Sequence, residues 1–144
     1  MIFPSAEWLL AAVAAVNAEP DLGRALSGLA PDLGAVVEAD PPAWEGSFAV
    51  YGRQERGRIA EARVLPDPDD LLELEPAYVL RAPYRLWKDL LLGRLDPVKT
   101  ALSGRLRVQG DLQALVRRSG YRYVVDRALA RLATEFADGA GRDG

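Results

Sequence analysis

The chain has 144 residues, of which 49% are hydrophobic and 27% charged, a composition typical of one globular domain large enough to bury a core. Its formal net charge of −3 argues against a broad nucleic-acid-binding surface, and its 18 basic residues are arginines apart from Lys88 and Lys99. The absence of cysteine and histidine excludes disulfides, thiolate nucleophiles, histidine general bases and zinc sites built from these ligands.

The beginning of the chain carries no sign of export or membrane insertion. Residues 1–5 lack the basic stretch with which a signal peptide starts. The longest apolar run, from Trp8 to Val16, has nine residues, whereas a bilayer span needs about 20. We therefore expect a cytoplasmic protein.

The first segment predicts two helices. Ser5 is a typical helix N-cap, and apolar residues recur at helical spacing from Trp8 to Val16. Pro20 ends this helix, and a second, shorter one is expected to follow as far as Leu29.

The pattern then changes to the alternation that is typical of strands. Strands are expected at residues 35–39, 44–51 and 58–65, with a polar turn at 52–57. In the third of these strands, Glu61 and Arg63 share the solvent face. The alternation therefore places Ala60, Ala62 and Val64 on the inner face.

The second half alternates between short helices and strands. After a loop at 66–70, a strand is expected at 77–81 and a helix from Pro83 to Gly93. Asp96 and Pro97 form a cap and a first helical position, opening a short helix that Gly104 closes. A strand at 105–109 and a helix from Asp111 to Gly120 complete this part.

The last predicted helix, residues 121–136, has the most regular apolar stripe of the chain. The stripe consists of Tyr121, Val124, Val125, Ala128, Leu129, Leu132 and Phe136. Two interpretations stay open: a lid that is hinged at Gly120 with nothing downstream to hold it, or a permanently docked core helix. Residues 138–144 are expected to be a disordered tail to a single domain of residues 1–137.

These elements predict an α/β (α+β) fold. Five strands in a mostly antiparallel or mixed sheet, with helices covering one face, give a two-layer sandwich. Small inner residues such as Ala60 and Ala62, opposite large helical residues such as Trp87 and Leu91, could leave an apolar slot between the layers.

The residues for common catalytic chemistries are absent. The sequence has no glycine-rich phosphate loop and no nucleophile elbow, and Ser47 and Ser103 have no histidine to activate them. The acidic residues between 67 and 75 lack the glycine that a calcium loop needs, because Leu72 holds that position. We therefore expect no catalytic residue, no metal and no cofactor.

Arginines are concentrated near the C-terminus, at Arg117, Arg118, Arg122, Arg127 and Arg131. One interpretation is a solvated helix face with ion pairs to Asp126 and Glu135. The other is contact with anionic lipid head groups or with a coenzyme-type phosphate.

The stretch from residue 77 to residue 115 resembles the sterol carrier protein (non-specific lipid transfer) family. The shared pattern is a helix ending in glycine, an Asp-Pro pair, a short helix, and a final glycine-basic-apolar segment. The matching residues are Gly93, Asp96, Pro97, Gly104, Arg105, Leu106, Val108, Gly110 and Asp111. The specific part covers about a quarter of the chain, and the rest agrees only in the order of the elements.

The resemblance implies a five-stranded sheet with helices over one face, around an apolar tunnel for fatty acyl chains, fatty acyl-CoA, sterols or phospholipids. Many relatives have an aromatic pair and a glutamine where this chain has Ala101, Leu102 and Ser103, so a differently shaped tunnel is expected. The chain also ends without the tripeptide that directs eukaryotic relatives to peroxisomes. Its last predicted helix is longer than a minimal member needs.

The expected function is therefore binding, with transfer as an extension, of a lipid or fatty acyl-CoA, without catalysis and without nucleic acid. The expected tunnel lining consists of Phe48, Ala60, Ala62, Trp87, Leu90, Leu91, Leu95, Val98, Leu102, Ser103, Leu106, Val125, Leu129 and Leu132. A transient membrane-surface contact and a homodimer stay open. The alternatives are an interaction or dimerisation module with a filled tunnel and, as the weakest, a hydrolase using Ser47 or Ser103.

Overall fold

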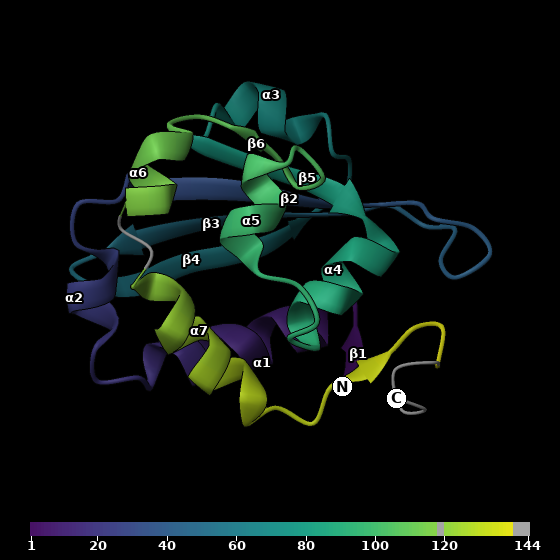
Figure 1. Cartoon of the computed structure of the whole chain (residues 1–144), viewed down its shortest axis with the longest axis horizontal. Helices are drawn as coiled ribbons and strands as arrows, with labels where there is room; N and C mark the ends of the chain where they lie inside the picture. Colours follow the sequence, from purple (N-terminus) through teal and green to yellow (C-terminus); the bar gives the residue numbers. More distant parts are fainter. Residues whose placement is uncertain (118–119, 140–144) are drawn as a thin grey trace.

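The alternating segments of the chain form a mixed sheet at the centre of the computed structural model, which describes residues 1–117 and 120–139 (Figure 1). In that part of the chain the sheet has five strands in the order β4-β3-β2-β5-β6. The central strands β2 and β5 are parallel, and every other neighbouring pair is antiparallel. The strands are β2 (Asp32–Glu38), β3 (Phe48–Glu55), β4 (Arg58–Leu65), β5 (Tyr78–Pro83) and β6 (Arg107–Gln109).

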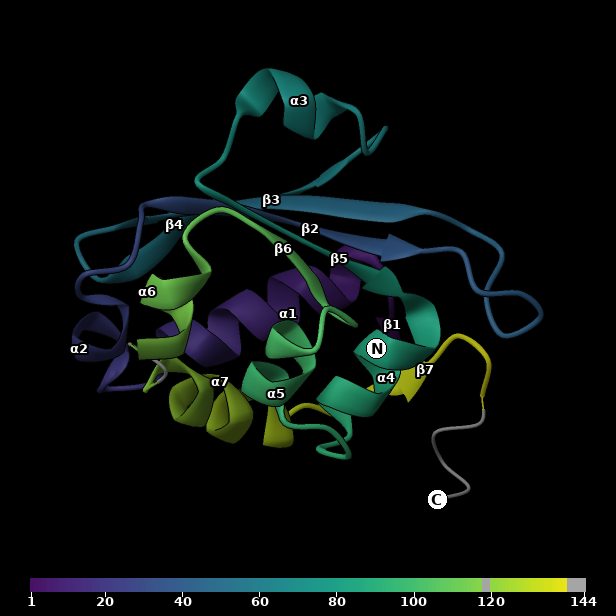
Figure 2. The same cartoon turned by 45° about the horizontal axis from the view of Figure 1, so that its top comes forward.

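Most helices lie on one face of this sheet, as the expected two-layer fold requires (Figure 2). The caps that the sequence predicts are present: Ser5 Oγ accepts from the Trp8 N–H at 3.1 Å, and Asp96 Oδ1 accepts from the Val98 N–H at 2.9 Å. The helices of this layer are α1 (Ala6–Asn17), α2 (Leu22–Leu26), α4 (Tyr84–Leu91), α5 (Pro97–Leu102), α6 (Leu112–Arg117) and α7 (Tyr121–Ala130).

The opposite face is partly covered by α3 (Asp70–Leu74), which the sequence did not predict (Figure 2). Leu71 of this helix is 2% exposed and packs in one cluster with Val36 and Tyr51 of the sheet. Gly34 makes room for it, because a Cβ there would lie 2.4 Å from a Leu71 methyl carbon. The predicted loop at 66–70 therefore runs directly into a helix that anchors one apolar side chain.

The two faces of the central strand β2 can be told apart from these contacts. Gly34 and Val36 face α3. Val37 packs in the cluster of Trp8 and Tyr84, on the side of the other helices. Because side chains alternate along a strand, Leu33 and Ala35 face the same helices as Val37.

The end of the chain differs from the predicted helix over 121–136. The helix α7 ends at Ala130, and β7 (Glu135–Phe136) pairs in parallel with β1 (Ile2–Phe3). The Phe136 and Phe3 rings lie 6.2 Å apart, and Trp8 Nε1 donates to Thr134 Oγ1 at 3.0 Å. Burial of Phe136 among aromatic side chains thus outweighs its fit to a helical stripe. The expectation that nothing downstream holds the last helix is wrong.

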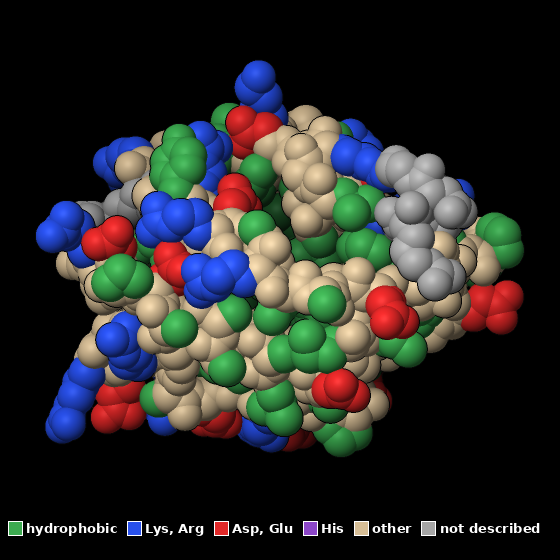
Figure 3. All heavy atoms as spheres, turned by 90° about the horizontal axis from the view of Figure 1, so that it is seen from below, with side chains coloured by type: hydrophobic (Ala, Val, Ile, Leu, Met, Phe, Trp, Pro, Cys, Tyr) green, Lys and Arg blue, Asp and Glu red, His purple; other side chains and the backbone are tan. Residues whose placement is uncertain are grey.

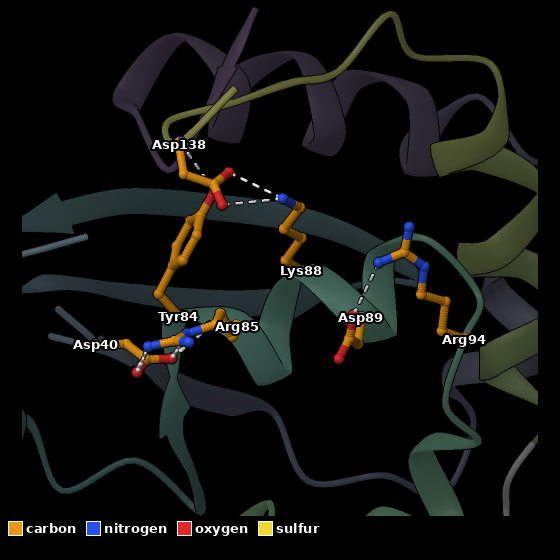
Figure 4. Close-up of polar contacts among 7 residues, drawn as sticks. All are labelled: Asp40, Tyr84, Arg85, Lys88, Asp89, Arg94 and Asp138. Carbon is orange, nitrogen blue, oxygen red and sulfur yellow. Dashed lines mark hydrogen bonds and ion pairs between the residues drawn. The ribbon is translucent and has the colours of Figure 1, made fainter. Parts of the chain in front are cut away.

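An ion pair fastens this segment to α4 (Figure 4). Lys88 Nζ lies 2.9 Å and 3.0 Å from the two carboxylate oxygens of Asp138, and the Tyr84 hydroxyl donates to the same carboxylate at 2.9 Å. Burial, above all, raises the pKa of Tyr84 to about 12, so this hydroxyl stays a donor. Asp138 belongs to the expected tail, residues 138–144. Residues 140–144 lie outside the described part of the chain. The domain boundary after residue 137 therefore stays a prediction.

Two of the ion pairs of α4, Lys88–Asp138 and Asp89–Arg94, give a matched test, because one partner of each stands on this helix (Figure 4). Lys88 and Asp138 have side chains that are 7% and 15% exposed, against 44% and 35% for Arg94 and Asp89. Asp138→Asn should lower the free energy of unfolding by about 3 kcal/mol, since it leaves a buried ammonium without its counter-charge. Asp89→Asn should lower it by less than about 1 kcal/mol. Urea unfolding measures both free energies. Equal losses of stability in the two variants would show that the Lys88–Asp138 pair does not fix the segment of residues 131–139.

Candidate functional site

The helix-facing side of the sheet carries apolar side chains in rows that run across the strands. The strand register places Ala35 between Val50 and Leu80, and extends this row to Val64 on one side and Val108 on the other. The next row contains Ala62, Gly52, Leu33 and Tyr78. The apolar residues of these two rows, apart from Tyr78, are called the floor below: Leu33, Ala35, Val50, Ala62, Val64, Leu80 and Val108.

The helical layer covers the floor unevenly. One row further along, Val37 and Ala82 are only 4% and 0% exposed. Leu33 is 40% exposed in a central strand, and the other floor residues are all half-buried. Apolar residues of central strands are normally buried by the opposite layer, so the accessibility of Leu33 is unusual for its position.

The packing of the helices agrees with this accessibility. Helix α1 packs on β4, and α4 packs on β2 and β5, whereas α7 packs mainly on α1 and α2. The apolar residues of α6, such as Leu115 and Val116, are only half-buried. The layer is therefore fixed to the sheet at two places, and Figure 3 shows a hollow with hydrophobic side chains in it on the side viewed from below.

Helix α7 is held in this layer by a buried carboxylate. Glu19 is 4% exposed and pairs with Arg131 and with Arg127, whose Nε lies 3.0 Å from it. Hydrogen bonds from Arg131 and then Arg127 keep the pKa of Glu19 below its usual value.

The expected partners of the C-terminal arginines are thus replaced. Arg127 and Arg131 pair across to the segment after α1, and Arg122 pairs with Asp96 at 3.2 Å. Neither Asp126 nor Glu135 forms an ion pair with these arginines among the described residues, and Glu135 lies beyond the end of the helix. Arg118 lies outside the described residues.

Most of the expected tunnel residues surround the floor as packed core. One cluster, around Trp8 and Tyr84, has partly buried neighbours that include Phe48, Trp87, Leu91, Leu129 and Leu132. The other contains Leu106, which is 6% exposed, with Leu90, Leu95 and again Trp87 packed against it. Trp87 is fixed further, because its Nε1 donates to the Val36 carbonyl oxygen at 2.9 Å. The structure brings these residues together, and their contact with a ligand stays a prediction.

The remaining expected residues divide into half-buried and exposed ones. Ala62, Val98 and Val125 are half-buried, and Ala62 belongs to the floor. Ala60 lies at a register shift between β3 and β4 and is exposed, so it does not share the inner face with Ala62 as expected. Leu102 is 59% exposed, and the exposed Ser103 donates its hydroxyl to the Thr100 carbonyl at 3.0 Å.

Sequence reasoning missed most of the floor. The predicted strand starts at Ala35, whereas β2 starts at Asp32, so the prediction leaves Leu33 outside the strand. The alternation from Phe48 to Val50 was the available signal. Which residues stand side by side across the sheet follows only from strand order and register, which one strand's pattern does not contain.

Two further features of the described residues bear on the class of site. No group of three or more Asp or Glu side chains there could hold a metal ion, the acidic stretch at 67–75 included. No helix there is both long and apolar enough to cross a membrane.

A five-stranded mixed sheet with most of the helices on one face (Figure 2) is the architecture that the sterol-carrier resemblance implies. The model of the SCP-2 sterol transfer family matches residues 47–120, just over half of the chain. The chain belongs to this family, as the motif between residues 77 and 115 predicts.

Solved structures agree on the fold. A crystal structure of sterol carrier protein 2 superposes with a TM-score of 0.74 at 23% identity, covering 90% of this chain and 98% of that one. A solution structure from Thermus thermophilus, a conserved hypothetical protein described as possibly a sterol carrier protein, gives 0.73 at 22% identity over 90% and 89%. Apo sterol carrier protein 2 from Yarrowia lipolytica gives 0.55 at 11% identity over 83% and 89%. No curated protein matches the chain.

The ion pairs of Glu19 predict a pH dependence. Because its pKa is lower in the folded than in the unfolded chain, its stabilisation is present above the ordinary value of 4.5 and is lost as the pH falls below it. At pH 7, Glu19→Gln should therefore be less stable than wild type, and the difference should shrink in acid. Urea unfolding between pH 7 and pH 3 measures this, with the exposed Glu45→Gln as the control. A difference that stays constant with pH would contradict the assignment.

Proposed function

We propose that this protein binds a lipid-like ligand without covalent chemistry, with the apolar chain of the ligand lying on the floor. The observation that carries the proposal is the exposure of Leu33, 40%, in the central strand and on the face that the helices cover. The membership of the SCP-2 sterol transfer family supports the same class of ligand.

The energetics of apolar burial are sufficient for such binding. Each buried methylene contributes about 0.8 kcal/mol, so a chain of about sixteen carbons supplies on the order of 10 kcal/mol before the entropic cost of association. Binding of this kind does not depend on one polar anchor. Fatty acids, fatty acyl-CoA, sterols and phospholipids are all candidates, and transfer between membranes would add a transient contact with a membrane surface.

We propose a carrier rather than an enzyme or a filled interaction module. The chain has no histidine or cysteine, and the Ser103 hydroxyl is engaged with a backbone carbonyl. A filled module would bury the floor, whereas Val50, Val64 and Ala35 are half-buried. The cytoplasmic location and the homodimer stay predictions from the sequence.

Two exposed leucines on opposite faces provide the test. Leu33→Asp puts a carboxylate on the floor, where an apolar chain would have to desolvate it, so affinity for a fluorescent fatty acid should fall by about tenfold or more. Leu72→Asp is the matched control, since Leu72 is 68% exposed on α3 and should leave the affinity unchanged. Fluorescence titration, with far-UV circular dichroism as a check of folding, measures both.

Two results would count against the proposal. One is a folded Leu33→Asp variant that binds as tightly as wild type. The other is a wild-type protein that binds no fatty acid, acyl-CoA, sterol or phospholipid across a broad panel.

A further inference from the structure

A surface hollow of about 450 Å³ lies between α2, α6 and α7, at one end of the molecule (Figure 1). Its wall combines an apolar part, Ala25 and Val124, with charged side chains. The full lining consists of Asp21, Arg24, Ala25, Ser27, Arg117, Gly120, Tyr123, Val124 and Arg127.

The charge of this hollow is positive and only partly compensated. Three arginines line it against one carboxylate, that of Asp21. Arg127 is engaged, with Nε 3.0 Å from Glu19 and Nη2 3.5 Å from Asp21. Within residues 1–117 and 120–139, Arg24 and Arg117 form no ion pair with any carboxylate. Two guanidinium groups therefore border the hollow with donors available for an anion.

The hollow lies at the end of the sheet where the floor is most exposed. The strand β2 begins at this end, beside α2 and α6 in both cartoon views, and Leu33 is its second residue (Figures 1 and 2). Gly120 of the hollow is followed directly by Tyr121, the half-buried first residue of α7. On the sheet, Leu33 lies beside Tyr78, its partner in the neighbouring strand β5.

We propose that Arg24 and Arg117 bind the phosphate of an anionic ligand whose apolar chain lies on the floor. The inference rests on the proposed function and adds the class of head group and its position. Guanidinium groups suit this role because their paired N–H donors match two phosphate oxygens and stay charged at every physiological pH. Arg127 and Asp21 set the geometry of the wall and are not contacts of the ligand in this proposal.

The experiment compares three probes that separate head group from chain: hexadecyl phosphate, hexadecanol and inorganic phosphate. Isothermal titration of the full chain is carried out for wild type, for the double variant Arg24→Gln/Arg117→Gln and for Arg105→Gln. Arg105 is the matched control, because it is exposed, forms no ion pair with the described carboxylates and does not line the hollow. Circular dichroism verifies that each variant is folded.

Wild type should bind hexadecyl phosphate more tightly than hexadecanol, and inorganic phosphate far more weakly than either. The double variant should lose about tenfold in affinity for hexadecyl phosphate for each arginine removed, as for a charge-assisted hydrogen bond, and should bind hexadecanol as wild type does. Arg105→Gln should change neither affinity.

Each contrary result would contradict a different claim: the arginine site, its connection to the floor, or lipid binding itself. If hexadecanol binds but the double variant keeps its full affinity for hexadecyl phosphate, the arginine site is overturned and the proposed function stands. If inorganic phosphate binds as tightly as hexadecyl phosphate, the hollow is a site for free phosphate and the connection to the floor is overturned. If neither C16 probe binds to wild type, the proposed function fails, and this inference fails with it.

Discussion

The attachment of the helical layer to the sheet at separate places is the constraint on which the rest of this structure depends. At one place α1 packs along β4, and at another α4 packs over the ends of β2 and β5. Around the second place, Phe3 lies 4.8 Å from Trp8 in an edge-to-face contact and also neighbours Tyr84 and Phe136. These aromatic side chains hold the two termini of the described chain together. Helix α7 then rests mainly on α1 and α2, and Leu33 of the central strand β2 stays 40% exposed.

An open apolar floor has a cost that a closed core would avoid. Apolar surface that stays accessible forgoes about 25 cal/mol for each Å² that could have been buried. Elsewhere the same chain buries its apolar residues closely, as Ala82, Tyr84 and Ala128 show with 0% exposure. In the same small domain Leu33 stays 40% exposed and Val50 half-buried, and we propose that this accessible apolar surface receives the apolar chain of a ligand. The Lys88–Asp138 pair connects the C-terminal segment to α4, and the ion pairs of Glu19 connect the segment after α1 to α7 and the residue after it.

The extent to which the sequence predicts this structure depends on the range of the interactions involved. The helix starts at Ser5 and Asp96 are predicted correctly because a capping side chain bonds to a backbone N–H within three residues. The strand at 58–65 is also predicted with its observed bounds. The error at 131–136 has the opposite origin. Phe136 has helical spacing from Tyr121, but its position is decided by Phe3, which is far away in the sequence. The floor was missed for the same reason, since its rows exist only after five strands have paired.

The most direct test of the central claim is to locate a bound fatty acid by methyl NMR. Protein with labelled Leu and Val methyl groups would be saturated with palmitate, and intermolecular nuclear Overhauser effects to the palmitate methylenes would be recorded. The account predicts contacts to Leu33, Val50 and Val64, and none to Leu71 or Leu72 on the opposite face. Contacts confined to the α3 face, or bound palmitate with no contact to the floor methyls, would contradict it.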